Sequence, residues 1–172
     1  MLSHSPLKYI LPIGILIALF LDGSISLVFS HLLLNNYYFI PQLTFLWLFF
    51  AMFFIQRINI RIEWWAALSG LIFDMYYTGI IGVYLFIFPL AIYMGKKLYK
   101  LLSVDIFSSI LIYIIDLSII YLLSFFVNKL QNLTSMSDSF FLVHVLGPTL
   151  IINILFLVIL YIPCQILFER LD

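Results

Sequence analysis

Long hydrophobic stretches fill most of the 172-residue chain, and short polar segments separate them. A helix that crosses a membrane needs about 20 mostly apolar residues. The pattern therefore predicts six transmembrane helices, packed as one all-α bundle in a single integral membrane domain over residues 1–172. Their expected ranges are 9–30, 39–55, 64–77, 80–94, 104–127 and 140–168.

The third and fourth ranges are short for a membrane crossing, and we divide them at Thr78-Gly79. Without that division, residues 64–94 would form one helix far too long for the bilayer. We therefore expect a tight hairpin, whose helices extend into flanking residues or thin the membrane locally.

The basic residues predict the orientation of the bundle. If the N terminus is cytoplasmic, seven of the eight Lys and Arg residues fall on the cytoplasmic side, and Lys129 alone falls outside. The seven are Lys8, Arg57, Arg61, Lys96, Lys97, Lys100 and Arg170. An excess of Lys and Arg in short cytoplasmic loops is typical of membrane proteins. Both termini are therefore expected in the cytoplasm.

Composition supports a membrane protein and excludes several functions. Hydrophobic residues make up 65% of the chain and charged residues 9%, whereas soluble domains carry about 25% charged residues. Positive and negative residues balance at 8 each, so nothing in the charge points to a nucleic-acid partner. The lone cysteine, Cys164, excludes an internal disulfide. The lipid bilayer is the expected surroundings of this chain.

The carboxylates of Asp22, Asp74 and Asp116 lie within the predicted spans. An aspartate at the centre of a membrane helix costs about 2.5–3.5 kcal/mol of insertion free energy. Ionisable groups at such positions are candidates for a functional site. They also hydrogen-bond neighbouring helices, which is the simpler interpretation.

Small residues accompany two of these aspartates at a spacing of four, which places them on one helix face. The two sets are Gly14, Ala18 and Asp22, and Ala66, Gly70 and Asp74. Small residues let helix backbones approach closely in a membrane. We expect these faces to contact other helices. Because Asp74 and His144 both fall in the outer halves of their spans, a pair between them is a further hypothesis.

Catalytic chemistry has little support in the sequence. We find no metal-ligand spacing, no nucleophile motif and no phosphate-binding glycine loop. Asp74 and Asp116 could be imagined as a catalytic aspartate dyad, but their sequence surroundings lack the features of such a site. We therefore expect no enzyme, no cofactor and no catalytic, cofactor-binding or metal residues.

Residues 70–98, GLIFDMYYTGIIGVYLFIFPLAIYMGKKL, carry a resemblance to a known family. This segment resembles the most recognisable part of the MreD family of bacterial rod shape-determining membrane proteins, in particular its Gram-positive members. By position, the pattern of the family falls on Gly70, Asp74, Gly79, Gly82 and Pro89. The resemblance leads us to expect that Asp74 holds the hairpin through hydrogen bonds near the Thr78-Gly79 turn.

The resemblance implies a non-enzymatic role in the cell-wall elongation machinery. The implied partners are an MreC-like bitopic protein, a RodA-like glycosyltransferase, a class B penicillin-binding protein and, indirectly, an MreB-like cytoskeleton. Asp22, Gly70, Asp74, Gly79, Gly82, Pro89, Asp116 and His144 are then the candidate structural or partner-binding positions in the membrane.

The alternative is a substrate-binding subunit of an energy-coupling-factor vitamin transporter. Those subunits are six-helix bundles of similar size, and the MreD fold is thought to resemble theirs. Asp22, Asp74 and His144 would then line an outward-facing pocket. No vitamin-binding motif and no motif for docking a coupling module is recognisable in the sequence.

Overall fold

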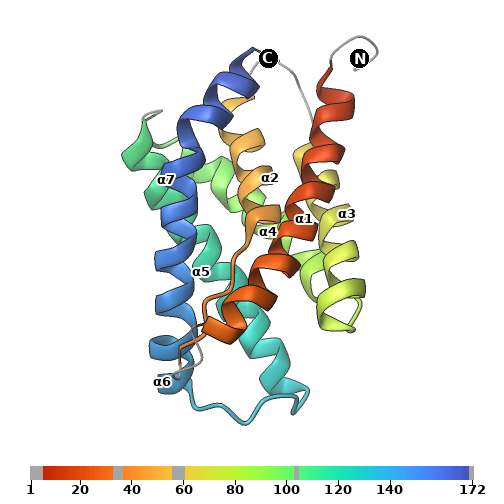
Figure 1. The fold of residues 1–172 in the computed structure, drawn as a ribbon, viewed down its shortest axis with the longest axis vertical. Coiled ribbons are helices and arrows are strands. Elements are labelled where there is room, and N and C mark those ends of the chain that lie inside the picture. Colours follow the sequence, from red (N-terminus) through yellow and green to blue (C-terminus); the bar gives the residue numbers. More distant parts are fainter. Residues whose placement is uncertain (1–5, 33–36, 56–60, 103–104, 171–172) are drawn as a thin grey trace.

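The computed structural model describes residues 6–32, 37–55, 61–102 and 105–170. Arg57 and Val104, which enter the predicted layout, lie outside these ranges. Within the described ranges, every regular element is helical (Figure 1). The elements are α1 (Leu7–Leu32), α2 (Leu43–Phe54), α3 (Ile62–Phe73), η1 (Asp74–Thr78), α4 (Val83–Tyr99), α5 (Ile106–Leu130), α6 (Asp138–Phe141), η2 (Leu142–Leu146) and α7 (Gly147–Glu169).

The π-helical segments η1 and η2 continue neighbouring helices, so the chain forms six helical rods over the described residues. Three of these rods are long and apolar enough to cross a membrane: Tyr9–Val28, Ile106–Leu130 and Asp138–Glu169. They coincide with the first, fifth and sixth predicted spans. The α3–η1 rod and α4 are shorter, as expected for a hairpin that breaks at Thr78-Gly79.

The second predicted span is wrong at its beginning. Helix α2 starts only at Leu43, and residues 37–42 run without regular structure. Pro41 gives one physical reason, because a proline disfavours helical geometry at the residue before it, here Ile40. Hydropathy does not distinguish such an apolar segment without regular structure from a helix, so the hydrophobic pattern assigned both to one span.

Helix α2 lies at the centre of the bundle and contacts α1, α3, α4 and α7. Every α2 residue except Trp47 is buried. A helix that is apolar on all sides is expected in such a buried position. Its aromatic side chains pack on the other helices; the Phe49 ring, for example, lies 5.0 Å from that of Tyr113 on α5.

The start of α1 and the end of α7 lie at the same end of the bundle, which we call the terminal end (Figure 1). The α5–α6 connection forms the far end, and the α3–α4 turn stops short of it (Figure 1). Large apolar side chains cover the outside of the bundle. Phe20, Phe86 and Ile159 are 68%, 73% and 66% exposed, respectively. Such a surface suits lipid rather than water as its surroundings.

Candidate functional site

The fully buried Asp74 carboxylate caps the beginning of α4 from the neighbouring helix. Oδ2 accepts hydrogen bonds from the backbone N–H groups of Gly82 at 2.9 Å and Leu85 at 3.1 Å. Oδ1 accepts one from the N–H of Tyr84 at 3.0 Å and one from the Thr78 hydroxyl at 3.2 Å. The first N–H groups of a helix have no partner within it, and the helix dipole favours negative charge there. Asp74 therefore satisfies donors at the beginning of α4 that would otherwise lack a partner within the helix.

Two glycines make this cap geometrically attainable. Gly79 ends η1 with φ of 68°, and its N–H donates to the Asp74 carbonyl at 2.8 Å. Gly82 precedes α4 with φ of 117°. Side chains rarely adopt such positive φ values, whereas glycine does so without strain. The chain therefore turns back on itself over Thr78–Val83, with the beginning of α4 directed at Asp74.

The other two positions of the resemblance lie on the same hairpin. A Cβ atom added at Gly70 would lie 2.6 Å from the Tyr84 carbonyl carbon, so this glycine permits close contact between α3 and α4. Pro89 lies half-buried inside α4. An interior proline removes one backbone hydrogen bond of its helix. The structure thus places Gly70, Asp74, Gly79, Gly82 and Pro89 in one α3–α4 unit.

Asp22 on α1 caps α2 in the same manner. Its Oδ1 accepts the Leu43 N–H at 2.6 Å, and its Oδ2 accepts the N–H and hydroxyl of Thr44 at 2.9 and 2.7 Å. Asp22 is 3% exposed and Asp74 is 0% exposed. Each aspartate therefore joins two helices by binding the N-terminal end of one of them.

The extended segment that precedes α2 is held by polar side chains of α7. The Asn153 amide accepts the Gln42 N–H at 2.8 Å and donates to the Ile40 carbonyl at 2.8 Å. The Thr149 hydroxyl accepts the Ile40 N–H at 3.3 Å and donates to the Tyr38 carbonyl at 3.2 Å. Irregular backbone is tolerated at membrane depth where protein groups satisfy it. The candidate positions chosen from the sequence did not include Thr149 and Asn153. Pro41, just before α2, was the sequence signal for an irregular segment whose backbone needs such partners.

Asp116 has a different environment from the other two aspartates. It is fully buried on α5, and neither carboxylate oxygen has a hydrogen-bond partner among the described residues. Gly95 of α4 faces it, because a Cβ atom added there would lie 3.3 Å from Asp116 Cγ. Asp116 therefore caps no helix, and the structure does not join it to Asp74 as a dyad.

His144 does not pair with Asp74, so that hypothesis is wrong. Its ring stacks on Phe140, with centroids 4.2 Å apart, and on Tyr37 at 5.2 Å. Its backbone carbonyl accepts the Tyr38 N–H at 2.7 Å. The Nδ1 atom is buried and has no partner within the described part of the chain. His144 thus helps hold the extended segment, while the Asp74 oxygens are occupied by the hairpin.

One ion pair joins α3 and α4 near the terminal end. Lys96 Nζ lies 2.7 Å from Glu63 Oε1, and the two side chains are 34% and 36% exposed. Partial burial raises the pKa of Glu63, but the Lys96 hydrogen bond, a backbone hydrogen bond at Glu63 and the charges of Lys96 and Arg61 together outweigh this effect and leave that pKa below its usual value. The pair thus adds a modest link to the α3–α4 hairpin.

These features define a multi-pass membrane protein whose buried polar side chains join its own helices. The chain belongs to the MreD family: the family model described as "rod shape-determining protein MreD" matches residues 7–171. The chain is also 29% identical over 131 residues to the rod shape-determining protein MreD of Bacillus subtilis (strain 168). That match covers 76% of this chain and 75% of the relative. No solved structure matches the chain.

The family match confirms the resemblance noted on residues 70–98. The protein is therefore a multi-pass protein of the plasma membrane, in a family that determines cell shape. This family is structural rather than a known family of enzymes.

Proposed function

We propose that this protein is a non-enzymatic component of the cell-wall elongation machinery that binds and organises wall-synthesis proteins within the membrane. Its proposed partners are an MreC-like bitopic protein, a RodA-like glycosyltransferase, a class B penicillin-binding protein and, indirectly, an MreB-like cytoskeleton. Membership of the MreD family over residues 7–171 is the observation that carries this proposal.

The geometry of the aspartates supports a structural role for them. Asp22 and Asp74 are buried, and helix N termini occupy their carboxylates. Neither group is accessible to a substrate or to the surface of a partner. We propose that these residues, with Gly70, Gly79 and Gly82, act by fixing the helix positions on which a partner then docks.

We further propose that both termini face the cytoplasm. The start of α1 and the end of α7 share the terminal end of the bundle (Figure 1). Helix α4, whose last turn carries Lys96 and Lys97, also ends there, whereas Lys129 lies in the last turn of α5 at the far end. This distribution follows the bias of Lys and Arg toward the cytoplasm.

The number of helices supports a fold similar to that of the substrate-binding subunits of energy-coupling-factor transporters. A solved structure would test this similarity at two features of the chain: the short helix α2, preceded by a segment without regular structure, and the α3–α4 hairpin capped by Asp74.

Mild detergent extraction of the tagged full-length protein from its host tests the function. We expect mass spectrometry to identify bitopic and multi-pass wall-synthesis proteins in the eluate. A second preparation, from cells that carry Asp74→Asn, should contain less of these wall-synthesis proteins for the same amount of tagged protein, because the α3–α4 hairpin of the variant is weakened. Recovery of transport ATPases together with a bound vitamin, and no wall-synthesis protein, would contradict the proposal.

A further inference from the structure

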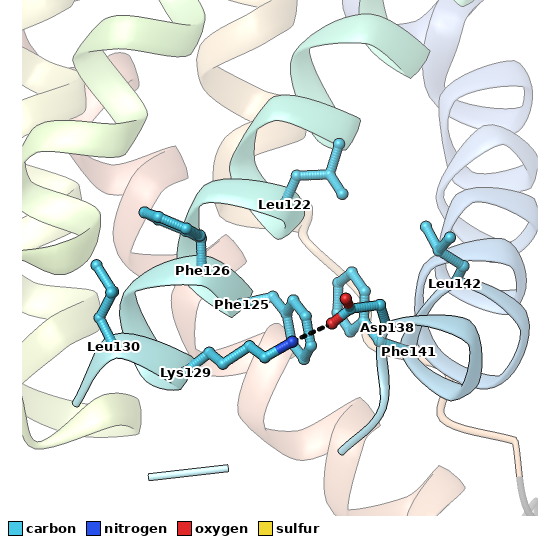
Figure 2. A pocket seen from close by; sticks show the side chains of 8 residues that line it. All are labelled: Leu122, Phe125, Phe126, Lys129, Leu130, Asp138, Phe141 and Leu142. Carbon is cyan, nitrogen blue, oxygen red and sulfur yellow. Dashed lines mark hydrogen bonds and ion pairs between the residues drawn. The ribbon is translucent and has the colours of Figure 1, made fainter. Parts of the chain in front are cut away.

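An apolar groove lies at the far end of the bundle, between the last turns of α5 and the α6–η2 segment (Figure 2). Its volume is about 590 Å³, within the range of roughly 300–1,000 Å³ that is common for small-molecule sites. Leu122 and Phe126 line it from α5, and Leu142 lines it from η2. These three side chains are 44%, 58% and 49% exposed, so the groove opens on the outer surface of the bundle.

The floor of the groove is aromatic and well packed. Phe125 of α5 and Phe141 of α6 both line it, and their rings stack with centroids 4.1 Å apart and an interplanar angle of 12°. This contact joins the two walls of the groove. The groove is therefore a feature of packed helices and does not depend on a loop alone.

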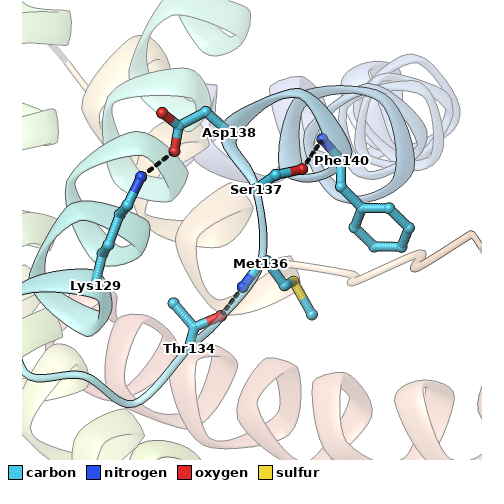
Figure 3. A network of polar contacts seen from close by, with 6 residues as sticks. All are labelled: Lys129, Thr134, Met136, Ser137, Asp138 and Phe140. Carbon is cyan, nitrogen blue, oxygen red and sulfur yellow. Dashed lines mark hydrogen bonds and ion pairs between the residues drawn. The ribbon is translucent and has the colours of Figure 1, made fainter.

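Two opposite charges lie at the mouth of the groove. The Lys129 ammonium pairs with the Asp138 carboxylate (Figures 2 and 3) and also lies 5.7 Å from the centroid of the Phe125 ring. The side chains of Lys129 and Asp138 are 49% and 71% exposed, respectively. Ser137 fixes the beginning of α6 beside them, because its hydroxyl accepts the Phe140 N–H at 3.3 Å (Figure 3).

We propose that this groove binds a phospholipid whose headgroup carries both a phosphate and an ammonium. One acyl chain lies in the apolar groove, the phosphate contacts Lys129, and the headgroup ammonium contacts Asp138. The two protein charges cancel, so a dipolar headgroup complements them both. An anionic headgroup without an ammonium would meet Lys129 but would be repelled by the adjacent Asp138.

Charge also favours a lipid over a transmembrane helix as the occupant. A helix laid along the groove would cover the Lys129–Asp138 pair, and removing an ion pair from water carries a large desolvation cost. A lipid headgroup keeps both charges at the polar boundary of the bilayer while its acyl chain fills the apolar part. This inference is independent of the proposed role in wall synthesis.

Native mass spectrometry of the purified, delipidated full-length protein tests the proposal. The probes are phosphatidylethanolamine and phosphatidylglycerol with identical acyl chains, each titrated in detergent. We expect tighter binding of the ethanolamine lipid. Lys129→Gln should weaken that binding about fivefold, the effect expected of one basic residue near a phosphate surface. Asp138→Asn should remove the preference between the two headgroups.

Matched variants separate the groove from the rest of the lipid-facing surface. Leu142→Trp fills the groove and should abolish the bound ethanolamine lipid, whereas Leu155→Trp on the exposed face of α7 should not. Lys97→Gln, at the other end of the bundle, is the control for Lys129→Gln. Thermal unfolding of each delipidated variant checks that it is folded before the lipid is added.

Three results would overturn the proposal. The first is equal binding of both headgroups to the wild type. The second is full binding of the ethanolamine lipid to a folded Leu142→Trp variant. The third is protein–protein adducts, formed in cells from a photo-crosslinking amino acid in place of Phe126, with a second copy or another membrane protein. Such adducts would assign the groove to a helix.

Discussion

Replacing Asp74 with asparagine tests how much the cap of α4 stabilises the bundle. The carboxylate accepts two hydrogen bonds at each oxygen, and all four partners are donors. An amide retains one oxygen and turns an NH₂ group toward the donors at the other position. In the less costly orientation, the amide NH₂ group takes the place of Oδ1. The Tyr84 N–H then loses its acceptor. The Thr78 hydroxyl keeps one, because it also donates to the Asp74 backbone carbonyl at 3.1 Å.

The expected loss of stability follows from these contacts. A buried donor left without a partner costs about 1–3 kcal/mol. Loss of a negative charge from a buried helix N terminus adds up to about 2 kcal/mol. We therefore expect Asp74→Asn to lower the free energy of unfolding by about 1–5 kcal/mol. The assay is reversible unfolding in mixed micelles, titrated with sodium dodecyl sulfate and followed by tryptophan fluorescence.

Asp116→Asn is the matched control for this measurement. Asp116 is equally buried, but its oxygens accept no hydrogen bond from the described residues. Its replacement should change the free energy of unfolding by less than about 1 kcal/mol, because no hydrogen bond is lost. Equal destabilisation by Asp74→Asn and Asp116→Asn would refute the capping argument.

Other parts of the structure give further expected outcomes in the same unfolding assay. Asp22→Asn should cost about 1–5 kcal/mol, as Asp74→Asn does, because the Leu43 N–H loses its acceptor and the beginning of α2 loses a negative charge; an unchanged free energy of unfolding would contradict this expectation. Gly82→Ala should destabilise by about 1 kcal/mol or more, since its φ is 117°; an unchanged midpoint would show that the turn relaxes. Asn153→Leu should expose residues 37–42 to faster amide exchange by mass spectrometry, because two backbone groups lose their partner; unchanged protection would argue against that support. Acidification should remove the contribution of the Glu63–Lys96 pair to the free energy of unfolding. Because the pKa of Glu63 is lower in the folded protein than its ordinary value of 4.5, that contribution is present above pH 4.5 and is lost as the pH falls through the pKa of the folded state. That loss of stability should stay below about 1 kcal/mol, because the pair is partly exposed to solvent, and it should be absent in Glu63→Gln; an equal loss in that variant would assign the effect to other groups.

The α3–α4 hairpin could be anticipated from the sequence to a large extent. A hydrophobic stretch too long for one crossing required a break, and Thr78-Gly79 supplied residues suited to a turn. The structure ends η1 at Thr78 and places Gly79 in a left-handed conformation. Local residue chemistry was sufficient here because the whole feature lies within one short segment.

The environments of Asp22 and of residues 37–42 could not be derived in the same way. The donors that Asp22 binds belong to Leu43 and Thr44, at the beginning of a different helix. Asn153 reaches the backbone of Gln42 across 111 positions of sequence. Hydropathy and four-residue spacing identify which side chains avoid lipid, but they do not identify the distant backbone groups that receive them.

As a member of the MreD family, this bundle determines cell shape. Depletion of the protein in its own host, with cell width measured by microscopy during growth, tests this claim directly. We expect the cells to widen and lose rod shape, and re-expression of the wild type to restore it. Unchanged rod shape after complete depletion would contradict the claim.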